Sequence, residues 1–410
     1  MADVIRHARA ISPWIIPNKG GSADDFHGLT DVGADPSVGS EDVYVIGKKA
    51  KCGTDKETPE VTVPLALLER GEINSYLTLA NLDSEPVGGF TLLDFNSSLV
   101  DTVYYVKDAF NGSLDSTVWM PKCAINSLNL NIDDPQARIT RDIELSSDDR
   151  RIFTGVNKYL IHVEDTAPSG TSGAYVIDIS DPAPIVDPNN AGVYVLRIDR
   201  TRSGETVSLA ITTNYTYSVG SSEITVLSAL TGDVYNVYYS ASSFGSAGDP
   251  TSVDTDPICF LKAENVTILI SDGTTEVEMT ELSSLTLSAT LNRIDENVLG
   301  NDERILREIS DTPVTVDFSG RVKDYKGEQA FMNQLDGTPM ISSVQLFNDN
   351  VKVTIKIYNN ADKDTFLIGY QVDNLSYTDG SFAFTANEFG TMDVSAQSDD
   401  VLITASEVNL

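Results

Sequence analysis

The fold is decided by the stretch Thr58-Pro59-Glu60-Val61-Thr62-Val63, which reappears as Thr312-Pro313-Val314-Thr315-Val316. After each copy, a Gly-Glu pair opens a short amphipathic run, first at Gly71-Glu72 and again at Gly327-Glu328. Because several markers recur in the same order and at similar spacing, we infer an internal duplication.

Charged loops and late strands extend the two copies. Upstream, the first copy has a lysine-rich loop and the second a loop of mixed charge; their charged residues are Lys48, Lys49 and Lys51, and Asp302, Glu303 and Arg304. Downstream, the alternating run 124–132 has a counterpart at 372–377. Each copy therefore predicts the order charged loop, strand, short helix and late strands.

The composition predicts an all-β protein with one short helix per repeat. Ser, Thr, Val and Tyr are plentiful, long helical runs are absent, and 41% of the 410 residues are hydrophobic, which suffices to bury cores. A chain of this length exceeds what one core usually serves, so we expect two or three domains. In the first copy, apolar residues at helical spacing predict a helix from about Gly71 to Leu82.

Four segments follow from turn and linker signals. Residues 1–42 read as an N-terminal arm with loops, in which Trp14-Ile15-Ile16 is an apolar anchor that docks on its own domain or on a neighbour. Residues 43–165 form the first copy, 174–245 an inserted small β-sandwich or Ig-like module, and 258–410 the second copy. Within the second copy, Gln371 to Phe384 predicts a hairpin that turns at Thr378-Asp379-Gly380-Ser381.

The net charge of −33 bears on the class of function. Nucleic-acid binding through phosphate contacts needs lysine and arginine, so ordinary DNA or RNA binding is disfavoured. Solubility, a high-salt habitat, or a surface that must not adhere to a polyanion each explain the excess. Composition alone does not choose among them.

The search for catalytic and metal-binding motifs finds little. The three cysteines suggest no disulfide framework, and the three histidines do not sit at ligand spacing. No nucleophile elbow or phosphate loop is present. Calcium stays open without assigned ligands, because no stretch fits an EF-hand. We expect no enzyme and no cofactor, and no membrane insertion, because no run approaches 18 apolar residues.

Tyrosines gather in three places, Tyr104-Tyr105, Tyr215-Thr216-Tyr217 and Tyr235 to Tyr239. They could line a carbohydrate-binding surface. At strand spacing, packing within a sheet is the commoner explanation.

The order of elements in each copy resembles the tail tube subunits of long-tailed bacteriophages and related viruses. The resemblance implies β-sandwich domains with a flanking helix and a long loop that reaches the next ring. Some members carry two tube domains, and three such chains close a pseudo-sixfold ring. By likeness, residues 47–57 and 295–311 would be inter-ring loops, and the late strands would line the lumen. The inserted segment also resembles small β domains of phage tail proteins.

The resemblance implies a structural virion protein whose stacked rings, of three chains each, surround a DNA-conducting channel. Its partners would be further copies of itself and other tail proteins, with DNA passing through without specific binding. It would assemble in the host cytoplasm and reside in the virion tail. The alternative is a tail-tip or surface adhesin that binds host glycans through the β insert. Ring closure uses both copies equivalently, whereas an adhesin needs no such equivalence.

Overall fold

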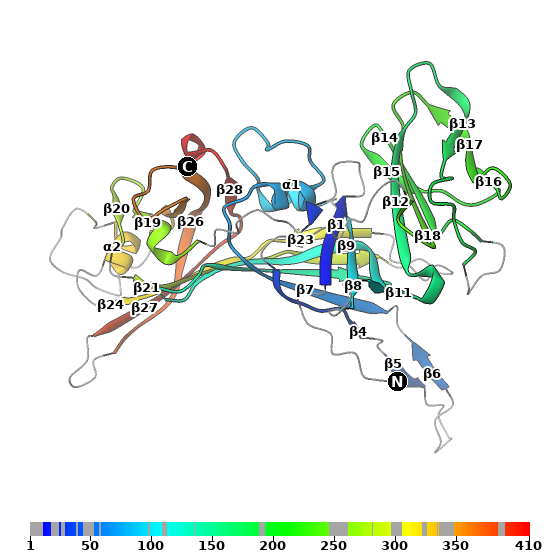
Figure 1. Ribbon diagram of the computed structural model, residues 1–410. Helices are drawn as coiled ribbons and strands as arrows, with labels where there is room; N and C mark the ends of the chain where they lie inside the picture. The colour runs from blue at the N-terminus through cyan, green and yellow to red at the C-terminus, as the bar shows by residue number, and fades with distance from the viewer. Residues whose placement is uncertain are drawn as a thin grey trace.

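The computed structural model shows an all-β protein built around one long, curved sheet (Figure 1). The structure describes residues 11–17, 24–25, 29–37, 40–43, 53–56, 59–96, 99–108, 113–134, 136–187, 193–245, 261–280, 282–296, 306–321, 326–333, 335, 348–383 and 390–410.

The first half of the chain (residues 11–154) forms the strands and short helices β1 (Ile11–Pro17), β2 (Asp24–Asp25), β3 (Leu29–Val32), β4 (Asp35–Ser37), β5 (Ser40–Val43), β6 (Gly53–Lys56), β7 (Glu60–Leu68), α1 (Asn74–Ala80), η2 (Leu92–Phe95), β8 (Val100–Lys107), β9 (Leu114–Ile132), β10 (Thr140–Ser147) and β11 (Arg151–Thr154).

The second half (residues 261–410) forms η5 (Ala263–Asn265), β19 (Val266–Ser271), β20 (Glu276–Glu278), β21 (Leu282–Thr290), β22 (Asn292–Glu296), β23 (Leu306–Asp311), β24 (Val314–Arg321), α2 (Lys326–Phe331), β25 (Val351–Tyr358), β26 (Phe366–Ala383), β27 (Thr391–Ser398), β28 (Leu402–Thr404) and η7 (Glu407–Asn409).

In chain order, the insert (residues 159–241) follows the first half and precedes the second, and η3 (Gly155–Asn157) comes directly before it. The insert forms β12 (Tyr159–Thr166), β13 (Ser172–Asp178), β14 (Arg197–Arg202), β15 (Glu205–Ser208), β16 (Tyr215–Ser218), β17 (Glu223–Leu230) and β18 (Val234–Ala241). These strands make a four-stranded and a three-stranded sheet around a core of their own.

The two halves share one topology. In each, a terminal hairpin (β1–β2 or β19–β20) pairs with the strand that follows the helix (β8 or β25). That strand pairs with the longest strand (β9 or β26), which also pairs with the next (β10 or β27). A separate hairpin, β5–β6 or β22–β23, precedes β7 or β24. The same pairings therefore occur twice in the same chain order.

Strand β7 illustrates why these residues form a half-buried sheet. Val61, Val63, Leu65 and Leu67 are buried and alternate with less buried neighbours. Helix α1 has only seven residues and no side-chain N-cap, so packing rather than propensity holds it. It ends at Asn81, whose left-handed conformation (φ 54°) lets its N–H reach the helix carbonyls. Both helices cover the same face of the sheet (Figure 1).

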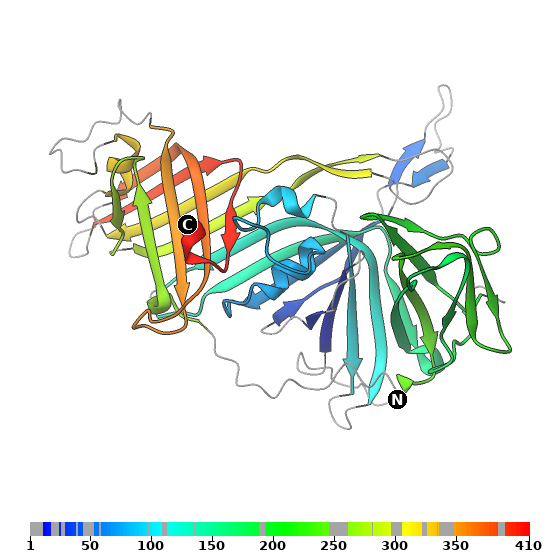
Figure 2. The same ribbon diagram turned by 90° about the horizontal axis from the view of Figure 1, so that it is seen from above.

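The hydrophobic core is continuous across the halves. One cluster joins Val63 and Tyr76 of the first half to Val316 and Tyr370 of the second. Seen from above, the long sheet runs through both halves, while the insert stands apart at one end (Figure 2).

Three segment predictions need correction. The predicted N-terminal arm contains a true strand, because β1 pairs with β8 along its whole length and buries Ile15 and Ile16. The strand Tyr159–Thr166, predicted to close the first copy, belongs to the insert, since it pairs with β18. The linker predicted at 167–173 is accordingly a turn within the insert and the first residues of β13.

The predicted hairpin at Gln371 to Phe384 is also wrong. Residues 366–383 form one continuous strand, which pairs first with β25 and then with β27. The Asp379 carboxylate accepts the Gly380 N–H at 2.8 Å, so the turn residues satisfy a local hydrogen bond without reversing the chain.

Candidate assembly interface

The two halves are joined edge to edge by antiparallel pairing of β9 with β21. Residues 127–132 of β9 face residues 285–290 of β21. The Leu291 N–H extends the ladder by donating to the Asn126 carbonyl at 2.7 Å. The result is a joined sheet whose strands lie in the order β4–β7–β10–β9–β21–β24–β27–β26.

A buried polar cluster reinforces this joint. The Tyr370 hydroxyl of the second half donates to Glu69 of the first at 3.1 Å, and lies 3.0 Å from the Tyr76 hydroxyl. The Arg141 guanidinium stands 3.7 Å from Glu69 and 4.8 Å from the centre of the Tyr76 ring. Glu69 is completely buried, and its carboxylate also accepts the N–H groups of Arg70 and Gly71 at 3.0 and 2.7 Å.

The electrostatics of this cluster favour the ion pair. Burial acts to lower the pKa of Arg141, but Tyr76 and Glu69 raise it above its ordinary value. Burial, with the Glu69 charge second, raises the pKa of Tyr370 well above its ordinary value. Arg141 therefore stays charged and Tyr370 stays a neutral donor.

Arg293 makes a second contact across the joint. From β22, its guanidinium donates to the carbonyls of Ile125, Asn96 and Phe95, at 3.0, 3.0 and 3.1 Å. The Asn96 side chain in turn accepts the Ile309 N–H of β23 at 2.8 Å. The hairpin β22–β23 thus lies along the first half, as Figure 2 shows.

The joined sheet is curved, and its concave face lies opposite the helices (Figure 1). The side chains that the strands place on this face are mostly polar and acidic. Its carboxylates, placed by the alternation of buried and exposed positions along each strand, are Asp35, Glu60, Asp142, Glu144, Asp317, Asp379 and Asp393. Apolar exceptions lie on β7, at Pro64, Ala66 and Leu68. Among the described side chains of these strands, with β9 taken from Ala124 on, where it pairs with β10, none on this face is a lysine or arginine.

Hydrogen bonds fix parts of this face. The Asp393 carboxylate accepts the hydroxyls of Ser319 at 2.5 Å and Ser381 at 3.0 Å, across three adjacent strands. The Asn131 amide donates to Asp142 at 2.9 Å. Burial raises the pKa of Asp142, the Asn131 hydrogen bond opposes this, and Asp133 adds to it. Neutral side chains therefore hold the carboxylates of Asp142 and Asp393 in place.

The insert is fixed to the first half by Arg197. Its guanidinium binds Asp101 of β8 bidentately and Asp199 of β14 at 2.7 Å. It also stacks on Tyr238 and Trp119, 4.2 and 5.2 Å from the ring centres. Asp101 and Trp119 are fully buried, so this contact is a structural anchor.

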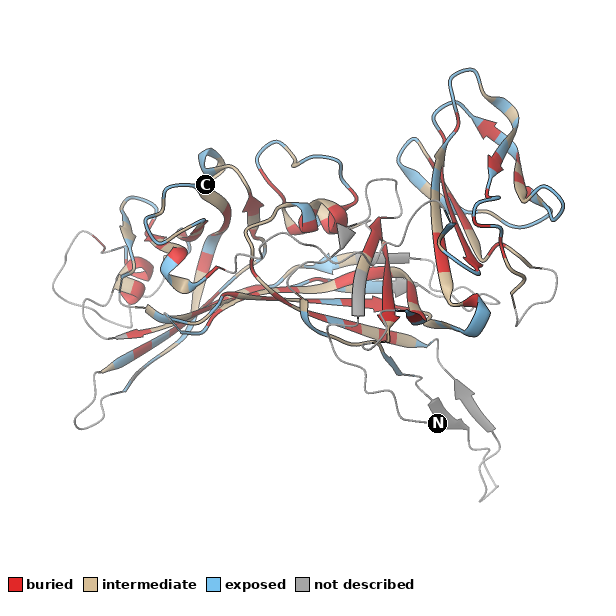
Figure 3. Ribbon diagram, in the orientation of Figure 1, coloured by how far each residue is buried: buried red, intermediate tan, exposed pale blue. Residues whose placement is uncertain are grey.

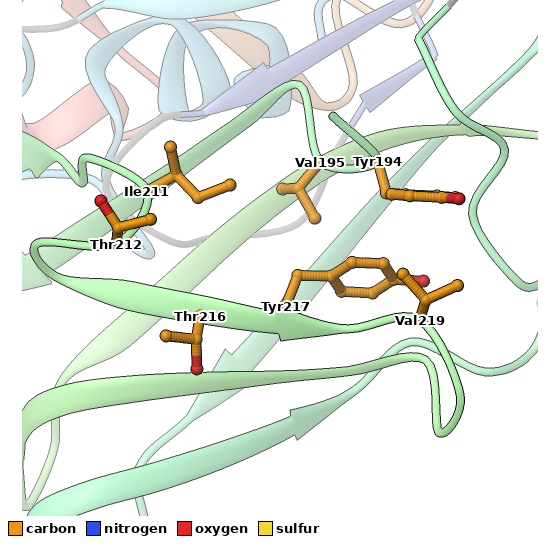
Figure 4. Close-up of a pocket in the computed structure, with 7 residues that line it drawn as sticks. All are labelled: Tyr194, Val195, Ile211, Thr212, Thr216, Tyr217 and Val219. Atoms are coloured by element: carbon orange, nitrogen blue, oxygen red, sulfur yellow. The ribbon is translucent and has the colours of Figure 1, made fainter. Parts of the chain in front are cut away.

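The insert carries a shallow pocket at its outer end, with a volume of about 280 Å³ (Figure 4). Two rings form its wall, Tyr194 and Tyr217, with centroids 5.1 Å apart. The other tyrosines singled out in the sequence, Tyr104, Tyr105, Tyr215, Tyr235, Tyr238 and Tyr239, are buried, so packing explains them.

The predicted site residues are only partly described. Lys48, Lys49, Lys51, Asp302, Glu303, Arg304 and Thr58 lie outside the described residues. Pro59 and Pro313 immediately precede β7 and β24, and Thr312 precedes Pro313. The ranges proposed as inter-ring loops overlap the two hairpins, through β6 and β23.

The Gly-Glu markers occupy different local structures. Gly71 lies between β7 and α1 at φ 75°, and Glu72, before α1, pairs with Arg70 at 3.0 Å. Gly327 and Glu328 lie inside α2 and are buried. A Cβ on Gly327 would stand 2.6 Å from the Phe318 ring, so glycine permits the close approach of α2 to β24.

Sequence reasoning missed the residues that join the halves. Glu69, Arg141, Tyr370 and Arg293 come from four separate elements, and no spacing in the sequence links them. One signal was available: a charged residue next to an apolar strand, such as Glu69 after β7, requires a buried partner. Among the described residues, no group of three potential metal ligands gathers. Likewise, none of the described helices is long and apolar enough to cross a membrane.

No family model matches the sequence, and the search of curated proteins finds no match. Among solved structures, the chain is similar to one from the sheath–tube complex of the extracellular contractile injection system PVC in its extended state. That match has 14% identity and a TM-score of 0.27, and covers 37% of this chain and 95% of the other. It is also similar to a chain of the anti-feeding prophage cap, which terminates the tube. There the identity is 16% and the TM-score 0.28, with 39% of this chain and 100% of the other covered.

Proposed function

We propose that this chain is a structural subunit that assembles with copies of itself into rings, which stack into the tube of a phage tail or tail-like particle. The observation that carries the proposal is the joint inside the chain. Two halves of one topology are joined head to tail, with β9 of the first bound to β21 of the second. Such a heterologous contact closes into a ring when repeated with the right rotation.

Among the described residues, no further strand pairs with the outer edges of the joined sheet, at β3–β4 and at the second part of β26, and this agrees with repetition. β26 is the second-half equivalent of β9, and β3–β4 are the first-half equivalents of β21. Each chain would present the strand its neighbour needs, so three chains would give six similar joints. An exposed strand edge is a ready template for pairing.

The concave face supports a channel. Its carboxylates, hydroxyls and amides would line the inside of a closed ring, because the helices cover the other face. Phosphates would be repelled there, so DNA would pass without specific binding. We propose no catalytic step. The partners would include other tail proteins, and the protein would be located in the tail of the particle.

The test is negative-stain microscopy of the concentrated protein, with its mass in solution measured in parallel. We expect hollow rings or tubes containing three chains per ring. Compact monomers at every concentration and salt would contradict ring assembly.

The pocket of the insert supports a second candidate function, glycan binding. The Tyr194 and Tyr217 rings at its outer pocket could stack on a sugar ring. A glycan screen with the intact chain tests this, with Tyr217→Ala as the matched variant. Glycan binding by the wild type that Tyr217→Ala loses would favour an adhesin. The absence of binding by the wild type would count against a glycan-binding role of the pocket.

A further inference from the structure

The joint inside the chain specifies how two chains would meet, and at which residues. We propose that residues 379–383 of β26 pair with residues 33–37 of a second copy, in the register of β9 with β21, and that Asp35 and Pro36 keep this joint weaker than the internal one. The inference rests on the proposed function and names the surfaces and the control of its assembly.

The register follows from two equivalent irregularities. Pairing of β9 with β10 skips Asn126, and pairing of β26 with β27 skips Thr378. Three residues beyond these points lie Asn129 and Ser381, which are therefore equivalent. Asn129 faces Ser288 inside the chain.

The other side of the joint is fixed in the same way. Ser288 faces Thr315 of β24, and Asp35 faces Thr62 of β7. Thr62 and Thr315 each face a residue of the next strand. That residue in turn pairs with one that lies two positions before the skipped residue, Asn126 or Thr378, so Thr62 and Thr315 are themselves equivalent. Asp35 of one copy would accordingly face Ser381 of the next.

Extending this register by two residues makes Ser37 face Asp379. The internal counterpart of that pair is Thr290 facing Ser127. A strand register is strongly specified where one face is buried, because a slip of one residue would reverse the faces.

The open edge lacks a donor that the internal joint has. The Gly33 N–H points inward, to the Pro64 carbonyl at 3.2 Å, so the alternation of the strand directs Ala34 and Pro36 toward the open side. Proline has no N–H, whereas the equivalent residue of β21, Ala289, has one. The Ala34 carbonyl, moreover, already accepts from Arg150 at 2.7 Å.

Charge weakens the joint further. Asp35 and Asp379 are both exposed and would lie diagonally across the ladder. The equivalent internal positions hold the neutral Ser288 and Ser127. Proline and charge are the devices that protect sheet edges from indiscriminate pairing. Salt would screen the repulsion and promote assembly.

The expected occupant is a second copy of this chain, because the same chain carries both complementary edges and already contains their working equivalent. A foreign strand would find the proline and the carboxylate without the matching register. If the edge instead binds a strand from another protein, the experiments below would show no pairing between copies of this chain.

The first experiment converts the open edge to the internal type. Asp35→Ser with Pro36→Ala should lower the concentration needed for assembly by about tenfold, from one restored hydrogen bond and one removed repulsion. Asp317→Ser is the matched control, because it removes a carboxylate from the same face at an interior strand. An equal effect of both variants, or no effect of the first, would overturn the control by Asp35 and Pro36.

The second experiment reads the register by disulfide cross-linking of the full chain with Cys52, Cys123 and Cys259 replaced. Asp35→Cys with Ser381→Cys, and Ser37→Cys with Asp379→Cys, should give covalent multimers under mild oxidation. Ser37→Cys with Ala383→Cys is four residues out of register and should give several-fold fewer. Asn129→Cys with Ser288→Cys should cross-link within one chain, which reports that the joined sheet is folded.

The outcomes separate the two proposals. Rings without cross-links at 35 and 381, while 129 and 288 do cross-link, would overturn the pairing and leave the proposed function. Cross-linked open chains without rings would support the pairing and count against the ring. Folded monomers that neither ring nor cross-link would overturn both.

Discussion

At the scale of single residues, buried charges decide how the parts of this protein are held together. Arg197 binds two carboxylates that are almost fully buried, Asp101 and Asp199, and lies against two aromatic rings. Each partner was visible in the sequence only as an ordinary charged residue. Their pairing depends on β8 and β14 meeting, which no local pattern encodes.

Arg197→Ala should lower the free energy of unfolding by about 3–5 kcal/mol, because it removes the cationic partner of the buried Asp101 carboxylate. Thermal unfolding followed by tryptophan fluorescence reports it, since Trp119 lies at the contact. The control is Lys262→Ala, whose ion pair with Glu264 is more than half exposed on both sides. That variant should change the stability by less than about 1 kcal/mol; equal effects would contradict the anchor.

His162 should make the insert sensitive to acid. Burial lowers the pKa of His162 below its ordinary value of 6.5, although its hydrogen bond to Asn236 acts in the other direction. Above pH 6.5 the side chain is neutral in both states; as the pH falls through the folded pKa, the unfolded state binds the proton more tightly and stability is lost.

We expect the melting temperature of the wild type to fall more steeply between pH 7 and pH 5 than that of His162→Gln. Titrating carboxylates affect both proteins alike, so the difference isolates the imidazole. Parallel curves would exclude His162 as a source of acid sensitivity.

At the scale of elements, the two longest strands organise the molecule. β9 and β26 each pair with one set of strands along their first part and with another along their second. In β26 the sequence contains turn residues, Thr378 to Ser381, and predicts a hairpin. Partners on β25 and β27 keep the chain extended instead, so tertiary pairing overrides local preference.

Arg293→Ala should destabilise the chain by about 1.5–3 kcal/mol, the usual range for hydrogen bonds to a charged group. The lost contacts anchor β22–β23 on the first half, so hydrogen exchange should increase in that hairpin before the rest of the sheet. Arg293→Lys keeps the charge but reaches fewer of the three carbonyls, so its stability should lie between those of the wild type and Arg293→Ala. Unchanged exchange in the hairpin of Arg293→Ala would argue against the anchor.

At the scale of the whole molecule, the curvature of the joined sheet gathers acidic side chains on one face. The sequence supplied a net charge of −33 without saying where it lies. The alternation of strands sends carboxylates such as Asp142, Asp317 and Asp393 to the concave side, while apolar neighbours face the helices.

Replacing Asp142, Asp317 and Asp393 by lysine should convert this face into one that retains DNA. Affinity should weaken as salt rises, with a log–log slope of about −0.9 for each phosphate neutralised. Electrophoretic mobility shifts measure it, with the wild type expected not to bind. The same substitutions at the exposed Asp362, Asp364 and Glu264, outside the joined sheet, are the control; equal retention would mean that net charge rather than the concave face decides.

The all-β class, the two short helices and the recurrence of the Thr-Pro strands could be predicted from the amino-acid sequence, because alternation and helical spacing are local properties. The sequence comparison aligns Val61-Thr62-Val63 with Val314-Thr315-Val316. The strand pairings of the two halves, taken independently, make the same residues equivalent. That β12 belongs to the insert, that β26 is continuous and that β9 pairs with β21 could not be predicted from the sequence in this way. Each of these depends on which distant strand supplies the hydrogen-bonding partner, and backbone hydrogen bonds in a sheet leave no trace in the spacing of side chains along one strand.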